Sequence, residues 1–154
     1  MEVIRTELAD RFPYVIMFQE PGVAEAGFDA DPAMWLQGFY LGGSRGKPFM
    51  DSAEFDVYAE AFRQGGISGP VNWYRNIDAN AQAFHDRLDA PISQPMLMIA
   101  ADSDPVLPLS LTEGMERWVG DLERVVIDGC THWTQQERPH EVNAALIDWL
   151  ERHR

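Results

Sequence analysis

The clearest pattern along the chain is a pair of short apolar runs in its second half. QPMLMIAADSD, residues 94–104, is apolar until it ends in acids, and LERVVIDG, residues 122–129, is centred on Val125, Val126 and Ile127. Apolar runs of this length, bounded by proline, glycine and acids, are typical of strands that are buried on both faces. We therefore predict a strand in each run.

A segment of helical periodicity follows each predicted strand. PLSLTEGMERWV, residues 108–119, has capping-box spacing between Ser110 and Glu113. The second segment begins near Pro139, whose missing N–H costs nothing in the first turn of a helix. Its apolar face is predicted to comprise Val142, Leu146, Trp149 and Leu150. The order strand, helix, strand, helix predicts an α/β fold with a parallel sheet.

The first half has helical patterns and no strand pattern. SAEFDVYAEAFRQGG, residues 52–66, and GPVNWYRNIDANAQAFHDRL, residues 69–88, each place aromatic side chains on one stripe, and the first ends at two glycines. Residues 20–50 are predicted to form a loop and one short helix, in DADPAMWLQGFY. We expect a helical layer over residues 1–90 and an α/β part over residues 91–154, joined by DAPISQP, residues 89–95.

Charge and composition narrow the classes of partner. The 154 residues carry 25 Asp and Glu against 12 Lys and Arg, a net charge of -13, which disfavours nucleic acid and anionic membranes. Cys130 is the one cysteine, so no internal disulfide can form, and we expect a cytoplasmic protein. No targeting segment and no apolar run long enough to span a membrane is visible. We expect neither a metal nor a cofactor.

Polar residues stand where the predicted strands end. Asp102 and Asp104 follow the first strand, and His132 follows the second. In a parallel sheet these ends meet at one edge, and neighbouring strands lie about 4.8 Å apart. Asp104 is therefore expected to hydrogen-bond His132 and leave the other ring nitrogen free to take a proton, while Asp102 shapes the turn. The alternative is that His132 only caps a turn.

Ser44 offers a second chemistry. GGSRG, residues 42–46, matches G-x-S-x-G, and the chain order Ser44, Asp104, His132 is that of serine hydrolases with the α/β-hydrolase fold. A nucleophile elbow needs a buried strand before the serine and a helix after it, and neither pattern flanks Ser44. We keep a serine esterase as an alternative function and expect GGSRG to be a surface loop.

Four segments, taken together, resemble the soluble epoxide hydrolases of the α/β-hydrolase fold. They are FQEPGVAEA, GPVNWYRN, LMIAADSDPVL and GCTHWTQQERPHEVN, in the family's order and over nearly the whole chain. The first two are specific to that family, and the last two would fit many α/β-hydrolases. The resemblance implies a partial α/β-hydrolase fold, in which a helical lid precedes the last two parallel strand–helix units.

The same resemblance implies roles for individual residues. It gives His132 and Asp104 the water-activating relay, and Tyr14 and Tyr74 the hydrogen bonds to the epoxide oxygen. The two hydroxyls are then expected in one cleft that faces His132. It places a small apolar epoxide against Trp133, Val106, Leu107 and Phe18. Without the resemblance, Tyr74 would be expected simply to pack beside Trp73. A haloalkane dehalogenase is a near neighbour, but paired tyrosines favour an epoxide.

The sequence departs from the family in one large respect. The family's nucleophilic aspartate lies in an earlier strand–turn–helix elbow, and no aspartate here has that context. We therefore expect a fragment, inactive alone, that needs an N-terminal half or associates with itself through apolar residues such as Leu97, Met98 and Ile99, which would otherwise be left in water. A non-catalytic binding module that keeps the lid is the other alternative.

Overall fold

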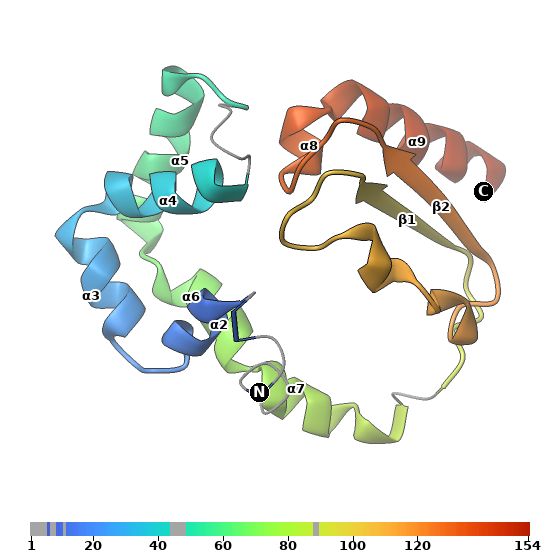
Figure 1. The fold of residues 1–154 in the computed structure, drawn as a ribbon, viewed down its shortest axis with the longest axis horizontal. Coiled ribbons are helices and arrows are strands. Elements are labelled where there is room, and N and C mark those ends of the chain that lie inside the picture. Colours follow the sequence, from blue (N-terminus) through green and yellow to red (C-terminus); the bar gives the residue numbers. More distant parts are fainter. Residues whose placement is uncertain (1–5, 7–8, 11, 44–48, 88–89) are drawn as a thin grey trace. The chain divides into compact units, whose positions relative to one another are not determined.

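The computed structural model describes residues 6, 9–10, 12–43, 49–87 and 90–154. Ser44 and Leu88 of the sequence predictions lie outside these residues. The chain divides into two compact units, and the figures draw both (Figure 1). One unit holds the described residues of Met1–Phe39 and Asp51–Leu88, and the other those of Tyr40–Met50 and Asp89–Arg154. We expected the second part of the chain to comprise residues 91–154. The second unit also includes the described residues of Tyr40–Met50.

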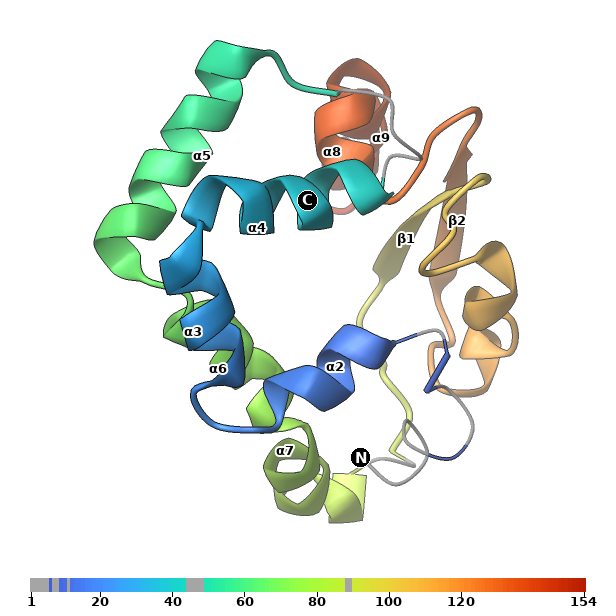
Figure 2. The same ribbon diagram turned by 60° about the vertical axis from the view of Figure 1, so that its left-hand side comes forward.

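The first unit is helical in the residues described, as its sequence pattern predicts. Its main helices are α2 (Pro13–Phe18), α3 (Val23–Ala30), α4 (Pro32–Gly43, up to Phe39), α5 (Ser52–Gly65), α6 (Ser68–Arg75) and α7 (Ile77–Ala83), with a 3-10 turn η1 (His85–Arg87). Helices α2, α3 and α6 pack against one another (Figure 2). Val15, Phe18, Ala24, Phe28 and Val71 on these three helices are buried.

Local chemistry explains where these helices begin. Asp51 caps α5, because its carboxylate accepts from the Glu54 N–H at 2.9 Å while Glu54 accepts from the Asp51 N–H at 2.8 Å. Asp31 accepts from the Met34 N–H at 3.0 Å at the start of α4. The prediction of one short helix between residues 20 and 50 was wrong, because α3 and α4 both form there and bury Phe28 and Leu36.

The single helix predicted over residues 69–88 is also wrong. The chain leaves helical geometry at Asn76, which has φ -90° and ψ 3°, and α6 and α7 lie on either side of it. The Asn76 amide donates to the Asn72 carbonyl at 2.8 Å. An asparagine side chain that bonds the nearby backbone competes with the helix, so the break has a local cause.

The second unit contains the predicted parallel sheet. Strands β1 (Met96–Ala101) and β2 (Leu122–Ile127) pair in parallel, from Met96 opposite Leu122 to Ala101 opposite Ile127. The helix predicted after Pro139 is confirmed as α9 (Pro139–Arg152), with the short α8 (Thr134–Glu137) before it. Helix α9 packs along both strands (Figure 1).

The helix predicted over residues 108–119 does not form. Two 3-10 turns, η2 (Leu109–Thr112) and η3 (Met115–Arg117), take its place. Glu113, expected to complete a capping box with Ser110, is extended at ψ 136°, and Gly114 follows with φ 78°. A left-handed glycine ends a helical path, so the periodicity of this segment was misleading.

The core of the second unit is small. Ala101, Ile127, Cys130 and Val142 are buried together, and Ile99 and Val125 pack against them. Leu97, Met98 and Ile99, expected to be left in water, are half-buried. Val142 is buried on the predicted apolar face of α9, but Leu146 and Leu150 of that face are exposed. Within the described residues, no helix is long and apolar enough to cross a membrane.

Candidate active site

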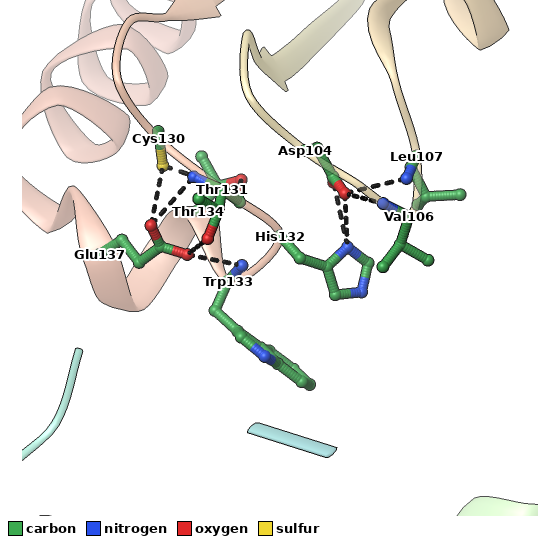
Figure 3. Close-up of polar contacts among 9 residues, drawn as sticks. All are labelled: Asp104, Val106, Leu107, Cys130, Thr131, His132, Trp133, Thr134 and Glu137. Atoms are coloured by element: carbon green, nitrogen blue, oxygen red, sulfur yellow. Dashed lines mark hydrogen bonds and ion pairs between the residues drawn. The ribbon is translucent and has the colours of Figure 1, made fainter. Parts of the chain in front are cut away.

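Asp104 and His132 lie within hydrogen-bonding distance at the carboxyl ends of β1 and β2. His132 Nδ1 is 3.0 Å from Asp104 Oδ2 and 3.2 Å from Oδ1. The parallel pairing puts both strand ends at the same edge, so that the two loops meet there. The predicted contact between these side chains is confirmed. The other ring nitrogen, Nε2, points away from Asp104 (Figure 3).

Asp104 is fixed by its own loop as well as by His132. Its Oδ1 accepts from the backbone N–H of Val106 at 2.7 Å and of Leu107 at 2.9 Å. Burial raises the pKa of Asp104, but the N–H groups of Leu107 and Val106 and the His132 ring outweigh it, so the pKa lies below its ordinary value. The carboxylate side chain is 8% exposed and the imidazole 25%, so the ring stays accessible beside a shielded anion. This arrangement can orient an imidazole and stabilise its protonated form.

Asp102 ties the two strand-end loops together. Its Oδ1 lies 3.3 Å from the Cys130 backbone N–H, which donates to it. The Gly129 backbone is the main cause of a lowered pKa at Asp102. The Ser103 N–H also donates to the Cys130 carbonyl at 3.1 Å. Asp102 therefore shapes the turn, as expected.

Glu137 is a site residue that our sequence reasoning missed. It closes α8 and turns its carboxylate back onto the loop that carries His132 (Figure 3). The carboxylate accepts from the Thr131 N–H at 2.9 Å, from the Trp133 N–H at 3.1 Å and from the Thr131 hydroxyl. The available signal was an acid five residues after a histidine in a polar turn. Whether such an acid reaches the loop depends on the path of the backbone between the two residues.

Trp133 packs within the second unit. Its ring lies 4.7 Å from that of Tyr40 and 6.1 Å from that of Phe49, between centroids. Val106 is half-buried and the Leu107 side chain is exposed, beside the backbone groups that hold Asp104. The substrate-binding role expected of these three side chains stays a prediction.

The two tyrosines lie together in the first unit. Tyr14 is in α2 and Tyr74 in α6, and their ring centroids are 5.7 Å apart with an interplanar angle of 86°. Phe18 is buried and contacts both rings, with centroids 5.7 Å from Tyr14 and 5.1 Å from Tyr74. That the two hydroxyls share a cleft facing His132 stays a prediction.

An ion pair secures the helices that carry these tyrosines. Arg75 donates to both oxygens of Glu25, at 2.7 and 3.0 Å, and to the Phe18 carbonyl at 2.8 Å. Gln19 donates to the Tyr74 carbonyl at 3.0 Å. These bonds join α2, α3 and α6 around the tyrosine pair. The Arg75 hydrogen bonds are the main cause that lowers the pKa of Glu25 from 4.5 to about 2.

No group of three or more His, Cys, Asp or Glu side chains that could hold a metal ion occurs among the described residues. The second unit thus contains an oriented histidine, and the first unit contains a tyrosine pair. Both are groups that move protons or donate hydrogen bonds to a developing anion.

Comparison with known proteins gives these groups a context. No family model matches the chain. Epoxide hydrolase A of Mycobacterium tuberculosis (strain ATCC 25618 / H37Rv) is 34% identical over 178 residues, covering 97% of this chain and 55% of the relative. Bifunctional epoxide hydrolase 2 of Rattus norvegicus is 36% identical over 174 residues, covering 97% of this chain and 31% of the relative.

Solved structures of epoxide hydrolases superpose on this chain as well. Epoxide hydrolase A from Mycobacterium thermoresistibile superposes with a TM-score of 0.81 at 35% identity, covering 90% of this chain and 51% of that one. Potato (Solanum tuberosum) epoxide hydrolase I gives a TM-score of 0.82 at 26% identity, covering 98% of this chain and 56% of that one.

The parallel sheet with its packed helix, and the helical unit before it, are therefore part of an α/β-hydrolase fold. The chain belongs to the epoxide hydrolase family of that fold. It spans about half the length of the mycobacterial relative (55%) and 31% of the rat relative.

Proposed function

We propose that these 154 residues supply the water-activating pair and the epoxide-oxygen donors of an enzyme that converts an apolar epoxide and water into a vicinal diol. One observation carries the proposal: Asp104 and His132 meet at 3.0 Å at the carboxyl ends of two parallel strands. Asp104 orients the ring, and Nε2 is left to receive a proton from water.

The reaction divides into two steps. In the first, an aspartate carboxylate attacks a ring carbon, the C–O bond breaks, and the oxygen takes a proton from Tyr14 or Tyr74, giving an ester. In the second, His132 takes a proton from a water that attacks the ester carbonyl. The tetrahedral intermediate collapses, the departing alkoxide takes the proton from His132 to give the diol, and the remaining carboxyl group loses its proton to solvent and becomes the carboxylate again. The tyrosine regains its proton from solvent.

The tyrosine pair supports an epoxide as the substrate. An alkoxide is a poor leaving group at neutral pH, and phenol hydroxyls aimed at it stabilise the charge that develops as the C–O bond breaks. Tyr14 and Tyr74 have ring centroids 5.7 Å apart, so both belong to one aromatic cluster. We assign apolar contacts with the substrate to Phe18, Trp133, Val106 and Leu107.

The attacking carboxylate comes from sequence other than these 154 residues in this proposal, because no aspartate among the residues that the structure describes combines a preceding strand with a helix directly after it. Exposed apolar side chains in the second unit support a covering segment. They include Val126 of β2 and Leu146, Ile147 and Leu150 of α9. We assign the covering of these side chains to an N-terminal half of the α/β-hydrolase core.

A chimera tests the proposal. These 154 residues replace the matching region of the Mycobacterium tuberculosis epoxide hydrolase A, and diol formation from a styrene-type epoxide is measured. We expect turnover by the chimera, none by the 154 residues alone, and none by the His132→Gln chimera. General-base help alone is worth only about 10²–10⁴-fold, far below the usual acceleration of about 10⁶-fold or more.

Two results would contradict the proposal. One is turnover by the isolated 154 residues that His132→Gln abolishes, since the attacking group would then lie among them. The other is loss of that turnover in Ser44→Ala, which would favour the serine esterase.

A further inference from the structure

The loop that carries His132 donates two backbone hydrogen bonds to one carboxylate, that of Glu137. The Thr131 N–H donates to Glu137 Oε2 at 2.9 Å, and the Trp133 N–H donates to Glu137 Oε1 at 3.1 Å. These are the backbone groups on either side of His132 (Figure 3). The carboxylate therefore holds the Cys130–Thr131 peptide and the His132–Trp133 peptide, from the side opposite to Asp104.

We propose that Glu137 is a positioning residue for His132. By holding both flanking N–H groups, it keeps the imidazole against Asp104 with the proton on Nδ1 and Nε2 free. Its catalytic consequence rests on the proposed function, in which His132 activates water. The orientation and tautomer of the His132 ring do not depend on the proposed function.

The partners of Glu137 are all donors. Oε1 also accepts from the Thr131 hydroxyl, and Oε2 lies 3.9 Å from the Cys130 thiol. Burial, and then the charge of Glu137, raise the pKa of that thiol, so it stays a donor. A carboxylate offers two acceptor oxygens, whereas a glutamine offers one oxygen and an NH₂ that cannot accept. The substitution Glu137→Gln would therefore set an NH₂ against one of the flanking backbone groups.

Further hydrogen bonds within the loop fix the position of Glu137. The Glu137 N–H donates to the Trp133 carbonyl at 2.9 Å, which closes the turn that brings the carboxylate under the loop. Arg138 donates to the Gly129 carbonyl at 3.0 Å, at the start of the same loop. Asp102 holds the Cys130 N–H. The segment between Cys130 and Glu137, which contains His132, thus relies on the Glu137 carboxylate alone for the N–H groups of Thr131 and Trp133.

Nitrogen-15 NMR of the imidazole rings in the 154-residue chain tests this directly. In alkaline buffer, where imidazoles are neutral, ring shifts distinguish the Nδ1–H from the Nε2–H tautomer. We expect His132 to be Nδ1–H in the unmodified chain and in Glu141→Gln, a matched change at an exposed glutamate of α9. In Glu137→Gln we expect a mixture of both tautomers. Exposed His85 and His140 serve as internal references.

Unchanged His132 ring shifts in a folded Glu137→Gln chain would overturn the proposal. If that variant does not fold, Glu137→Asp decides, because it keeps both acceptor oxygens but shortens the side chain by one methylene and so withdraws them from the N–H groups of Thr131 and Trp133. A measurable share of the Nε2–H tautomer in Glu137→Asp supports the proposal, and shifts identical to those of the unmodified chain overturn it.

The chimera separates this inference from the proposed function. Glu137→Gln is expected to lower kcat about tenfold to hundredfold with little change in KM, the size of effect that a displaced catalytic group gives, while Glu141→Gln leaves both unchanged. If the His132→Gln chimera stays active, the proposed function fails, and the tautomer result still stands or falls by itself. If only the tautomer result fails, the role of Glu137 is lost and that of His132 is kept.

Discussion

Replacing Asp104 by asparagine is expected to invert the histidine tautomer rather than merely weaken a contact. Asp104 Oδ1 accepts two backbone hydrogen bonds, from Val106 at 2.7 Å and from Leu107 at 2.9 Å. An asparagine keeps its oxygen there, because the opposite rotamer would set an NH₂ against two N–H donors. The NH₂ then occupies the place of Oδ2, which lies 3.0 Å from His132 Nδ1.

That geometry determines the size of the effect. An NH₂ facing Nδ1 makes Nδ1 an acceptor, so the ring proton moves to Nε2, and Nε2 can no longer take a proton from water. The same substitution in the Ser-His-Asp triad lowers kcat by about 10⁴-fold through the wrong tautomer. We expect a loss of about 10³–10⁴-fold in ester hydrolysis, or about 4–5.5 kcal/mol of activation free energy.

Single-turnover kinetics of the chimera can isolate the affected step. Ester formation from a styrene-type epoxide should proceed at nearly the unmodified rate in Asp104→Asn, since it uses the tyrosines and the attacking carboxylate. Ester hydrolysis should slow by about 10³–10⁴-fold and become the rate-limiting step. Nitrogen-15 shifts of His132 in the same variant should report the Nε2–H form. Hydrolysis within tenfold of the unmodified rate, or a retained Nδ1–H tautomer, would refute the reasoning.

Three further outcomes are expected. Tyr14→Phe and Tyr74→Phe should each slow ester formation in the chimera about 10²–10³-fold, as loss of one oxyanion donor does, and leave ester hydrolysis unaffected; equal loss in both steps would argue against the assignment. Glu25→Gln should lower the midpoint of thermal unfolding at neutral pH and flatten its acid dependence. The pKa of Glu25 is lowered from 4.5 to about 2, so its contribution is present above pH 4.5 and is lost as the pH falls toward 2; parallel pH profiles for both chains would show that Arg75 does not act through this carboxylate. Leu36→Ala, at a side chain that is 2% exposed, should lower the free energy of unfolding by about 2–5 kcal/mol in urea titration, and a change below about 0.5 kcal/mol would show that α4 is not packed as described.

The sheet and its functional edge could be predicted because their signals are local. Strands buried on both faces are continuous apolar runs, so β1 and β2 were visible as such, and acids or a histidine directly after each run place chemistry at the carboxyl ends. Pro139 marks the start of α9 in the same way. The Asp104–His132 contact followed from strand geometry alone.

The helices that were predicted wrongly end at single residues whose effect hydrophobic periodicity does not reveal. Asn76 interrupts a regular apolar stripe because its side chain bonds the Asn72 carbonyl, and Gly114 takes a left-handed conformation inside a segment with helical spacing. Glu137 could not be recognised either, because its partners are backbone groups whose positions exist only once the loop has folded. The tyrosine roles came from resemblance, since no residue spacing reveals which hydroxyl faces a substrate.

The central claim is that His132 acts on an ester formed elsewhere in the enzyme, and intact-protein mass spectrometry tests it most directly. The His132→Gln chimera is mixed with a styrene-type epoxide, quenched in acid and weighed. The account predicts a covalent adduct of one epoxide per chain, absent from the isolated 154 residues, with the label located outside them after digestion. Diol formation without any adduct, or an adduct within these 154 residues, would contradict it.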